Sequence, residues 1–194
     1  MAPKKRIGGK EMKDLFKVKL TTKSMSYMAL FVALQIILEV VFDFIPAQPA
    51  GGNISMDLLP VIFASYFMGA GYGVLVGVMC VILQFALGLA SFYGPWSLVL
   101  DYLIPVAVVG LAALFKNIQC KNFTIYTGVI VTLIMKFLSH YLSGAWLFAE
   151  YAPAGQNPWV YSFFYNISYC LPVLILCYIG FTILYPRLKK SLKF

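Results

Sequence analysis

Long apolar runs, separated by short polar, glycine- or proline-containing stretches, make up most of this chain. A helix that crosses a bilayer needs about 20 mostly apolar residues. Six runs meet this requirement: 24–45, 54–70, 72–91, 95–115, 123–150 and 159–185. The pattern predicts an all-α membrane protein in which a six-helix transmembrane domain (24–186) is flanked by a basic N-terminal arm (1–23) and a basic tail (187–194).

The composition supports the same class. Hydrophobic residues make up 61% of the 194 positions and charged residues 11%, whereas soluble domains carry about a quarter charged residues. The six runs use nearly the whole chain. No room remains for a soluble catalytic domain.

The distribution of positive charge predicts the orientation, because Lys and Arg are retained on the cytoplasmic side of a membrane. Fourteen of the fifteen Lys and Arg residues lie before the first run, between the fourth and fifth, or after the sixth. The three loops expected outside have none. Both termini are therefore predicted to be cytoplasmic, in a multi-pass protein of the cell membrane. The net charge of +8 reflects this topology and contact with anionic lipid rather than nucleic acid binding.

Polar side chains inside the predicted spans are the main functional signal. Each costs about 2.5–3.5 kcal/mol at a helix centre, so such residues usually have a function. Counted from the predicted helix ends, Asp101, Lys136, His140 and Asn166 fall at similar depth in the outer half of the bundle. This convergence predicts a polar ligand site. Lys136, the single exception to the charge rule, is expected to form an ion pair with Asp101.

Several nearby residues have a plain structural explanation as well. Tyr161 and Tyr165 could be interfacial belt residues, and Glu39 and Asp43 could simply be hydrated near the outer surface. On the first helix, Ala29 and Ala33 form a small-residue face that would allow another helix to approach closely.

The chemistry expected at the site is binding. A carboxylate with flanking aromatic rings suits a flat, cationic or amidine-like ligand, through charge-assisted hydrogen bonds and cation–π attraction. The sequence contains no phosphate-binding loop, HExxH motif or nucleophile elbow. We therefore expect no catalytic residues, no metal site and no cofactor.

Three segments give the chain a specific resemblance: "GGNISMDLLPV", the Asp101–Tyr102 pair, and "SHYLSGAWLFAEYAPAGQNPWVYSFFYNISYCLP". They are similar to the thiamine-specific substrate-binding (S) component of energy-coupling factor (ECF) transporters. The resemblance implies a six-helix protein that captures thiamine from outside and works with a transmembrane coupling protein and two cytosolic ATPases. It also implies that the face formed by Ala29 and Ala33 docks the coupling protein.

The resemblance further implies roles for individual residues. Asp101 stands where the family usually has a Glu that contacts the aminopyrimidine, with Tyr102 beside it. His140 matches a histidine near the thiazolium, and Gly144 matches a small residue that makes room for ligand. Three further positions complete the implied site: Phe148, matching an aromatic residue, and the polar pair Tyr161 and Asn166. The loop 46–52 lacks the aromatic residue expected to cover the ligand.

Two alternatives stay open at this point. One is an S component for another flat vitamin, such as riboflavin or a pyrimidine. The other is a proton-coupled secondary transporter in which Asp101 and His140 act as a relay, although the chain shows no internal repeat of the kind many such carriers have. A membrane enzyme is a more distant third.

Overall fold

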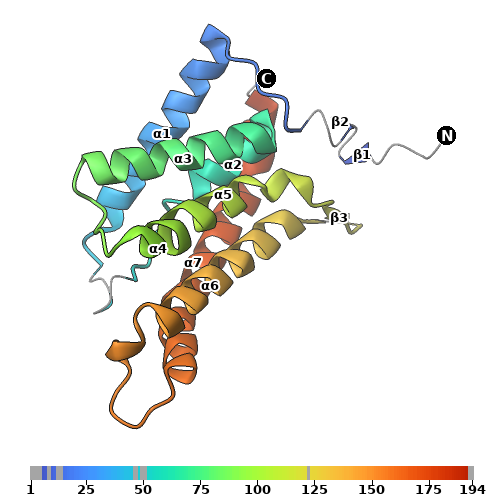
Figure 1. Ribbon diagram of the computed structural model, residues 1–194. Coiled ribbons are helices and arrows are strands. Elements are labelled where there is room, and N and C mark those ends of the chain that lie inside the picture. Colours follow the sequence, from blue (N-terminus) through green and yellow to red (C-terminus); the bar gives the residue numbers. More distant parts are fainter. Residues whose placement is uncertain are drawn as a thin grey trace, which may run out of the picture.

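Six helical segments form a bundle (Figure 1) in the computed structural model, which describes residues 6–7, 10–11, 15–45, 48, 52–121 and 123–191. The segments are α1 (Thr22–Phe42), α2 (Leu59–Met68), α3 (Ala70–Ala86), a composite of α4 (Pro95–Ser97), η1 (Leu98–Leu103) and α5 (Ile104–Gly110), α6 (Thr127–Trp146) and α7 (Pro158–Ser191). Short elements connect or precede them: η2 (Ala112–Leu114), η3 (Ala149–Tyr151), the antiparallel pair β1 (Arg6–Ile7) and β2 (Lys10–Glu11), and the antiparallel pair β3 (Ile118–Gln119) and β4 (Thr124–Ile125). The six-helix membrane fold is as expected from the apolar runs.

Helix lengths divide the segments into two kinds. Four are long and apolar enough to cross a membrane: Thr22–Phe42, Pro95–Leu114, Thr127–Trp146 and Pro158–Lys190. The other two, α2 and α3, are shorter apolar helices. Eight of the ten residues of α2 are buried, and its side chains Val61, Ile62 and Ala64 form part of the core. A helix enclosed by its neighbours need not match the bilayer thickness.

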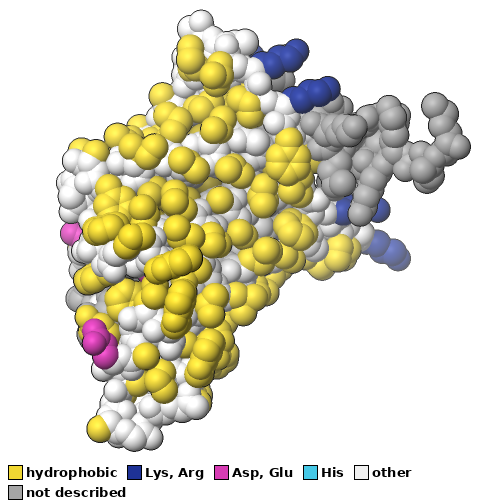
Figure 2. Space-filling model, viewed as in Figure 1, with side chains coloured by type: hydrophobic (Ala, Val, Ile, Leu, Met, Phe, Trp, Pro, Cys, Tyr) yellow, Lys and Arg dark blue, Asp and Glu magenta, His cyan; other side chains and the backbone are white. Residues whose placement is uncertain are grey.

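Charged and apolar side chains occupy different parts of the surface. Figure 2 shows hydrophobic side chains over most of one face, while Lys and Arg gather towards the end where α1 begins and α7 ends. Large apolar side chains such as Ile37, Val41 and Phe164 are about half exposed or more, as lipid-facing residues should be. The polarity of the bundle agrees with the positive-inside pattern.

A widened helical turn interrupts the fourth span. Pro105 has no N–H to donate to the carbonyl of Asp101, so regular α-helical bonding cannot continue there. In the adjacent η1, a π-helix, the N–H of Ile104 bonds the carbonyl of Val99, five residues back. Such π turns are frequent at functional sites. This one contains both Asp101 and Tyr102.

Glycines set the spacing between α3 and α5. A Cβ at Gly73 would collide with the carbonyl oxygen of Gly110, and one at Gly77 would come within 3.0 Å of the carbonyl oxygen of Val106. Gly69 has φ +122° and separates α2 from α3. The four-residue glycine repeat therefore serves close backbone packing.

Several predicted boundaries differ from the structure. The second predicted span, 54–70, becomes helical only at Leu59: residues 52–56 have no regular secondary structure, residues 57–58 form a turn, and several of them line a cavity. The last helix runs through Pro186 to Ser191, across the boundary placed between domain and tail. The predicted covering loop falls largely on residues outside the described part of the chain, as do many positions of the basic arm and the last three of the tail.

The glycine packing predicts opposite outcomes for two alanine substitutions. We expect Gly73→Ala to lower stability by about 1–3 kcal/mol, because the new methyl meets backbone and forces the helices apart. Gly180→Ala meets Cδ2 of Leu59 at 3.3 Å and, more closely, the terminal methyl of Met56 at 2.6 Å. That flexible group can move, so the helix preference for Ala over Gly should leave this variant neutral or stabilised by up to about 1 kcal/mol. Unfolding in detergent measures both, and equal effects would contradict the packing explanation.

Candidate ligand-binding site

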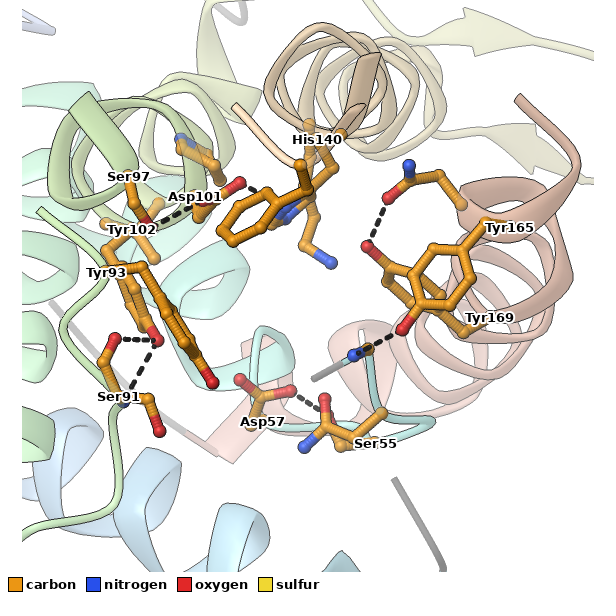
Figure 3. Close-up of a pocket in the computed structure, with 18 of the residues that line it drawn as sticks. Ser55, Asp57, Ser91, Tyr93, Ser97, Asp101, Tyr102, His140, Tyr165 and Tyr169 are labelled. Atoms are coloured by element: carbon orange, nitrogen blue, oxygen red, sulfur yellow. Dashed lines mark hydrogen bonds and ion pairs between the residues drawn. The ribbon is translucent and has the colours of Figure 1, made fainter. Parts of the chain in front are cut away.

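A cavity of about 260 Å³ lies in the half of the bundle opposite the start of α1. Its walls come from the last turns of α1 and α3, the middle and end of α6, the fourth span, the first half of α7, and the connecting segments 52–58, 89–93 and 148–151 (Figure 3). Every residue predicted to bind ligand or support the site lines it: Asp101, Tyr102, Lys136, His140, Gly144, Phe148, Tyr161 and Asn166. The structure therefore brings together the residues that the sequence placed at similar depth.

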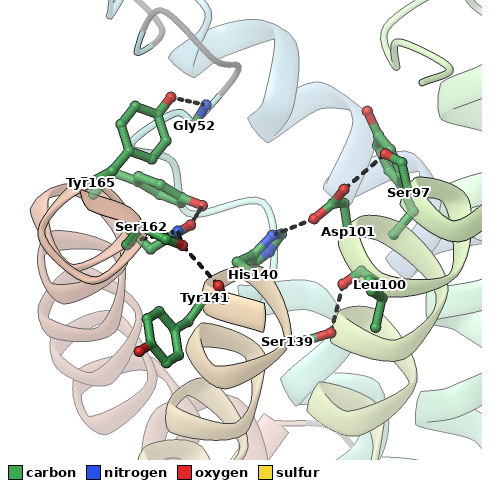
Figure 4. A network of polar contacts seen from close by, with 12 residues as sticks. Gly52, Ser97, Leu100, Asp101, Ser139, His140, Tyr141, Ser162 and Tyr165 are labelled. Atoms are coloured by element: carbon green, nitrogen blue, oxygen red, sulfur yellow. Dashed lines mark hydrogen bonds and ion pairs between the residues drawn. The ribbon is translucent and has the colours of Figure 1, made fainter. Parts of the chain in front are cut away.

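Asp101 joins the fourth span to α6. One carboxylate oxygen accepts a hydrogen bond from the Ser97 hydroxyl at 2.8 Å, and the other lies 3.4 Å from Nδ1 of His140 (Figure 4). A second bond between these helices runs from the Ser139 hydroxyl to the Leu100 carbonyl at 2.6 Å. Both contacts fix the position of the carboxylate at the cavity wall.

The predicted ion pair between Lys136 and Asp101 is not formed. The ammonium of Lys136 lies over the ring of Tyr169, 5.7 Å from its centroid. His140 is one helical turn farther along the same face of α6, and its imidazole, rather than the ammonium of Lys136, contacts the Asp101 carboxylate. Lys136 therefore rests in a cation–π contact with α7.

Ser97, Asp101 and His140 do not form a catalytic triad. The serine hydroxyl donates to the carboxylate rather than to the imidazole, so no base is placed to activate it. The carboxylate stands between the other two groups. The arrangement holds a charge in place and is suited to binding.

The α6–α7 wall depends on Gly144. A Cβ at this position would collide with the Ser162 hydroxyl and come within 3.1 Å of the Asn166 amide nitrogen. Asn166 itself is buried, donates to the Ser162 carbonyl at 2.8 Å and accepts from the Tyr169 hydroxyl at 2.5 Å. Gly144 thus admits α7, and Asn166 holds the ring of Tyr169 against the cavity.

Aromatic rings cover the remaining walls. Phe148 packs edge-on against Tyr93, with centroids 5.5 Å apart. Tyr102 is anchored through its hydroxyl, which bonds both the N–H and the carbonyl of Ser91. Tyr165 accepts a hydrogen bond from the N–H of Gly52 at 3.3 Å, which connects the segment 52–58 to α7. These rings present flat apolar faces beside the charged groups.

Two acidic residues that line the cavity, Asp57 and Glu39, were absent from the predicted site. Asp57 accepts hydrogen bonds from Ser55 and, at 3.4 Å, from Gln35. Glu39 accepts from Gln35 at 3.1 Å and from Gln84 at 2.7 Å. Glu39 was considered from the sequence, but hydration near the outer surface explained its presence equally well. Asp57 occupies the polar tip of a short span, which is typical of an interface residue.

The remaining pair of predicted functional residues lies elsewhere. Ala29 and Ala33 are exposed on α1, and neither lines the cavity. Their side chains are on the lipid-facing surface of the helix. Within the described part of the chain, no three His, Cys, Asp or Glu residues group as a metal site would require.

Fold and cavity together define a multi-pass membrane protein with a polar cavity in one half of a six-helix bundle. The family described as "Thiamine transporter protein" matches residues 25–193. The chain belongs to this family. It is a transport protein of the cell membrane rather than an enzyme, as the sequence led us to expect.

Individual relatives agree with the family assignment. The thiamine transporter ThiT of Bacillus subtilis is 29% identical over 176 residues, covering 84% of this chain and 92% of the relative. ThiT of Lacticaseibacillus paracasei is 26% identical over 129 residues, covering 59% and 63%. A solved structure of ThiT from Listeria monocytogenes superposes with a TM-score of 0.71 at 16% identity, covering 87% of this chain and 96% of that one, and it shares the fold.

A double-mutant cycle distinguishes the observed partner of Asp101 from the predicted one. We expect Asp101→Asn and His140→Gln to show a coupling energy of about 0.5–3 kcal/mol, as contacting residues do. Asp101→Asn with Lys136→Met should show a coupling energy near zero. Unfolding free energies in mixed detergent give both values, and a large coupling to Lys136 alone would contradict the observed contacts.

Proposed function

We propose that the protein captures thiamine from outside the cell as the S component of an ECF transporter. The observation that supports this most is the cavity's composition: three carboxylates face one ammonium group among aromatic walls. The cavity occurs in a member of the thiamine transporter protein family. Its place at the end opposite the basic termini suits entry from outside.

The chemistry of thiamine fits these walls. Thiamine joins an aminopyrimidine, which donates hydrogen bonds, to a thiazolium ring with a permanent positive charge. A carboxylate accepts charge-assisted hydrogen bonds from an amino group, and aromatic faces attract both flat rings and cations. A neutral or anionic vitamin would leave the excess negative charge uncompensated.

Each wall is assigned part of the ligand. Asp101 receives the aminopyrimidine, with Tyr102 beside it, and His140 lies near the thiazolium. Phe148 and Tyr161 supply aromatic faces. Three further residues shape the cavity wall without an assigned part of the ligand: Gly144, Asn166 and Lys136.

ATP-driven transport requires partners, because the chain has no phosphate-binding loop of its own. We propose that a transmembrane coupling protein docks on the exposed small face of Ala29 and Ala33, and that two cytosolic ATPases drive release inwards. Small residues allow close helix contact within a membrane. Both alanines lie on the lipid-facing side of α1, away from the cavity, so docking and ligand binding use different surfaces.

Removing the charge of Asp101 tests the ligand assignment. Asp101→Asn should weaken thiamine binding by about 1.5–3 kcal/mol, the range for hydrogen bonds to charged groups. Isothermal titration of the detergent-purified chain measures this. Glu150→Gln is the control, since Glu150 is exposed and does not line the cavity. Unchanged affinity in a folded Asp101→Asn variant would remove this residue from the site.

An arginine on α1 separates capture from coupling. Ala29→Arg should abolish ATP-driven thiamine uptake in vesicles that contain the coupling protein and ATPases, while thiamine binding by the purified chain persists. Ile134→Arg is a depth-matched control, because Ile134 is exposed and lies seven residues after the start of α6, as Ala29 does in α1. Loss of uptake in both variants, or of binding in Ala29→Arg, would argue against docking at this face.

A further inference from the structure

A second negatively charged wall lies across the cavity from Asp101. Figure 3 shows Asp57 on the side opposite Asp101 and His140. Glu39 is its neighbour, since Gln35 Nε2 donates to both carboxylates, at 3.1 and 3.4 Å. One carboxylate oxygen of Glu39 and one of Asp57 therefore share a single donor, so the distance between them cannot exceed the sum of the two hydrogen-bond lengths.

Neither carboxylate of this wall has a cationic partner among the described residues. The one ion pair seen in the cavity joins Asp101 to His140, and Lys136 lies over Tyr169. Two like charges this close raise each other's free energy. Because Lys136, the one ammonium group among the residues that line the cavity, pairs with neither of them, their charge is available to a cation that enters the cavity.

The amide of Gln35 shows how firmly the charges are held. Its side chain is 2% exposed, and its nitrogen faces the two carboxylates while its oxygen is buried without a hydrogen-bond partner. A buried amide oxygen without a donor is costly. The reverse orientation would point that oxygen at two anions, so the carboxylates determine how the amide lies.

Donors from the protein supply hydrogen bonds to both carboxylates. Glu39 receives bonds from Gln35 and Gln84, and Asp57 from Ser55 and Gln35. Both bonds to Glu39 end on Oε2 and hold the side chain in place. A quaternary thiazolium nitrogen has no hydrogen to donate, so a carboxylate attracts it through charge rather than through a hydrogen bond.

We propose that Glu39 is a specificity-determining residue that selects the positively charged ring of the vitamin by charge alone. The proposal rests on thiamine capture as the function. A phosphate ester carries about −1.5 to −2 charges at neutral pH, so the same wall also rejects phosphorylated thiamine. Gln35 and Gln84 act as positioning residues that hold the carboxylate of Glu39 towards the cavity.

Three ligands test this assignment: thiamine, its neutral analogue in which carbon replaces the thiazolium nitrogen, and thiamine monophosphate. Glu39→Gln keeps the shape of the side chain and removes its charge. We expect thiamine to bind this variant about tenfold more weakly, from the loss of one unit charge near the ring. Binding of the neutral analogue should stay within about twofold of the parent, and the preference for thiamine over its monophosphate should narrow.

A matched control is Asp43→Asn, which removes a carboxylate one turn farther along from an exposed position outside the cavity. It should leave all three affinities unchanged. Equal weakening of thiamine and of the neutral analogue by Glu39→Gln would show that Glu39 acts through structure rather than charge, and would overturn the proposal. Unchanged affinity for thiamine would also overturn it.

Two further measurements complete the test. If Glu39→Gln does not fold, Gln84→Met provides a second test, because it removes the donor 2.7 Å from the Glu39 carboxylate. This variant should bind thiamine more weakly than the parent, by less than tenfold, and should bind the neutral analogue as the parent does. Equal effects on the two affinities would overturn the assignment. Failure of the parent chain to bind thiamine would contradict the proposed function itself. A parent that binds thiamine and its neutral analogue equally well would contradict only the role of Glu39.

Discussion

Holding carboxylates inside an apolar bundle is the constraint on which the rest of this structure depends. A buried anion is tolerated only where donors surround it. Asp101 obtains them from its own span through Ser97 and from α6 through His140. The neighbouring Pro105 prevents regular α-helical bonding, and the resulting π turn carries Asp101. The Asp101 carboxylate therefore has two roles: it joins the fourth span to α6, and it places a negative charge in the cavity.

Close helix packing places these groups within reach of one small ligand. Gly144 allows α7 to approach α6, while Gly73 and Gly110 bring α3 and α5 together. Because the side chains of α2 form part of the core, the cavity that contains Asp101 lies towards one end of the bundle, next to these buried side chains. Binding and docking are then separated by geometry, with the polar groups enclosed and the face of Ala29 and Ala33 turned outwards.

The fold was predictable because its signals are strong and additive. Six apolar runs and a one-sided distribution of Lys and Arg determine the number of helices and their orientation. Residues such as Asp101 and His140 were identifiable because ionisable groups within a span need a reason to persist. Their choice of partner was not. Lys136 and His140 share one helix face, and only the relative position of α6 and the fourth span decides which reaches Asp101. Asp57 was missed because a carboxylate at the tip of a short span also fits an exposed interface.

The most direct measurement of the central claim is titration of the detergent-purified chain with a vitamin panel, without ATP, a proton gradient or partner proteins. We predict that one molecule of thiamine binds per chain, while riboflavin and free pyrimidines bind far more weakly or not at all. Binding of riboflavin or a pyrimidine in preference to thiamine would contradict it, as would thiamine binding that appears only when a proton gradient is present.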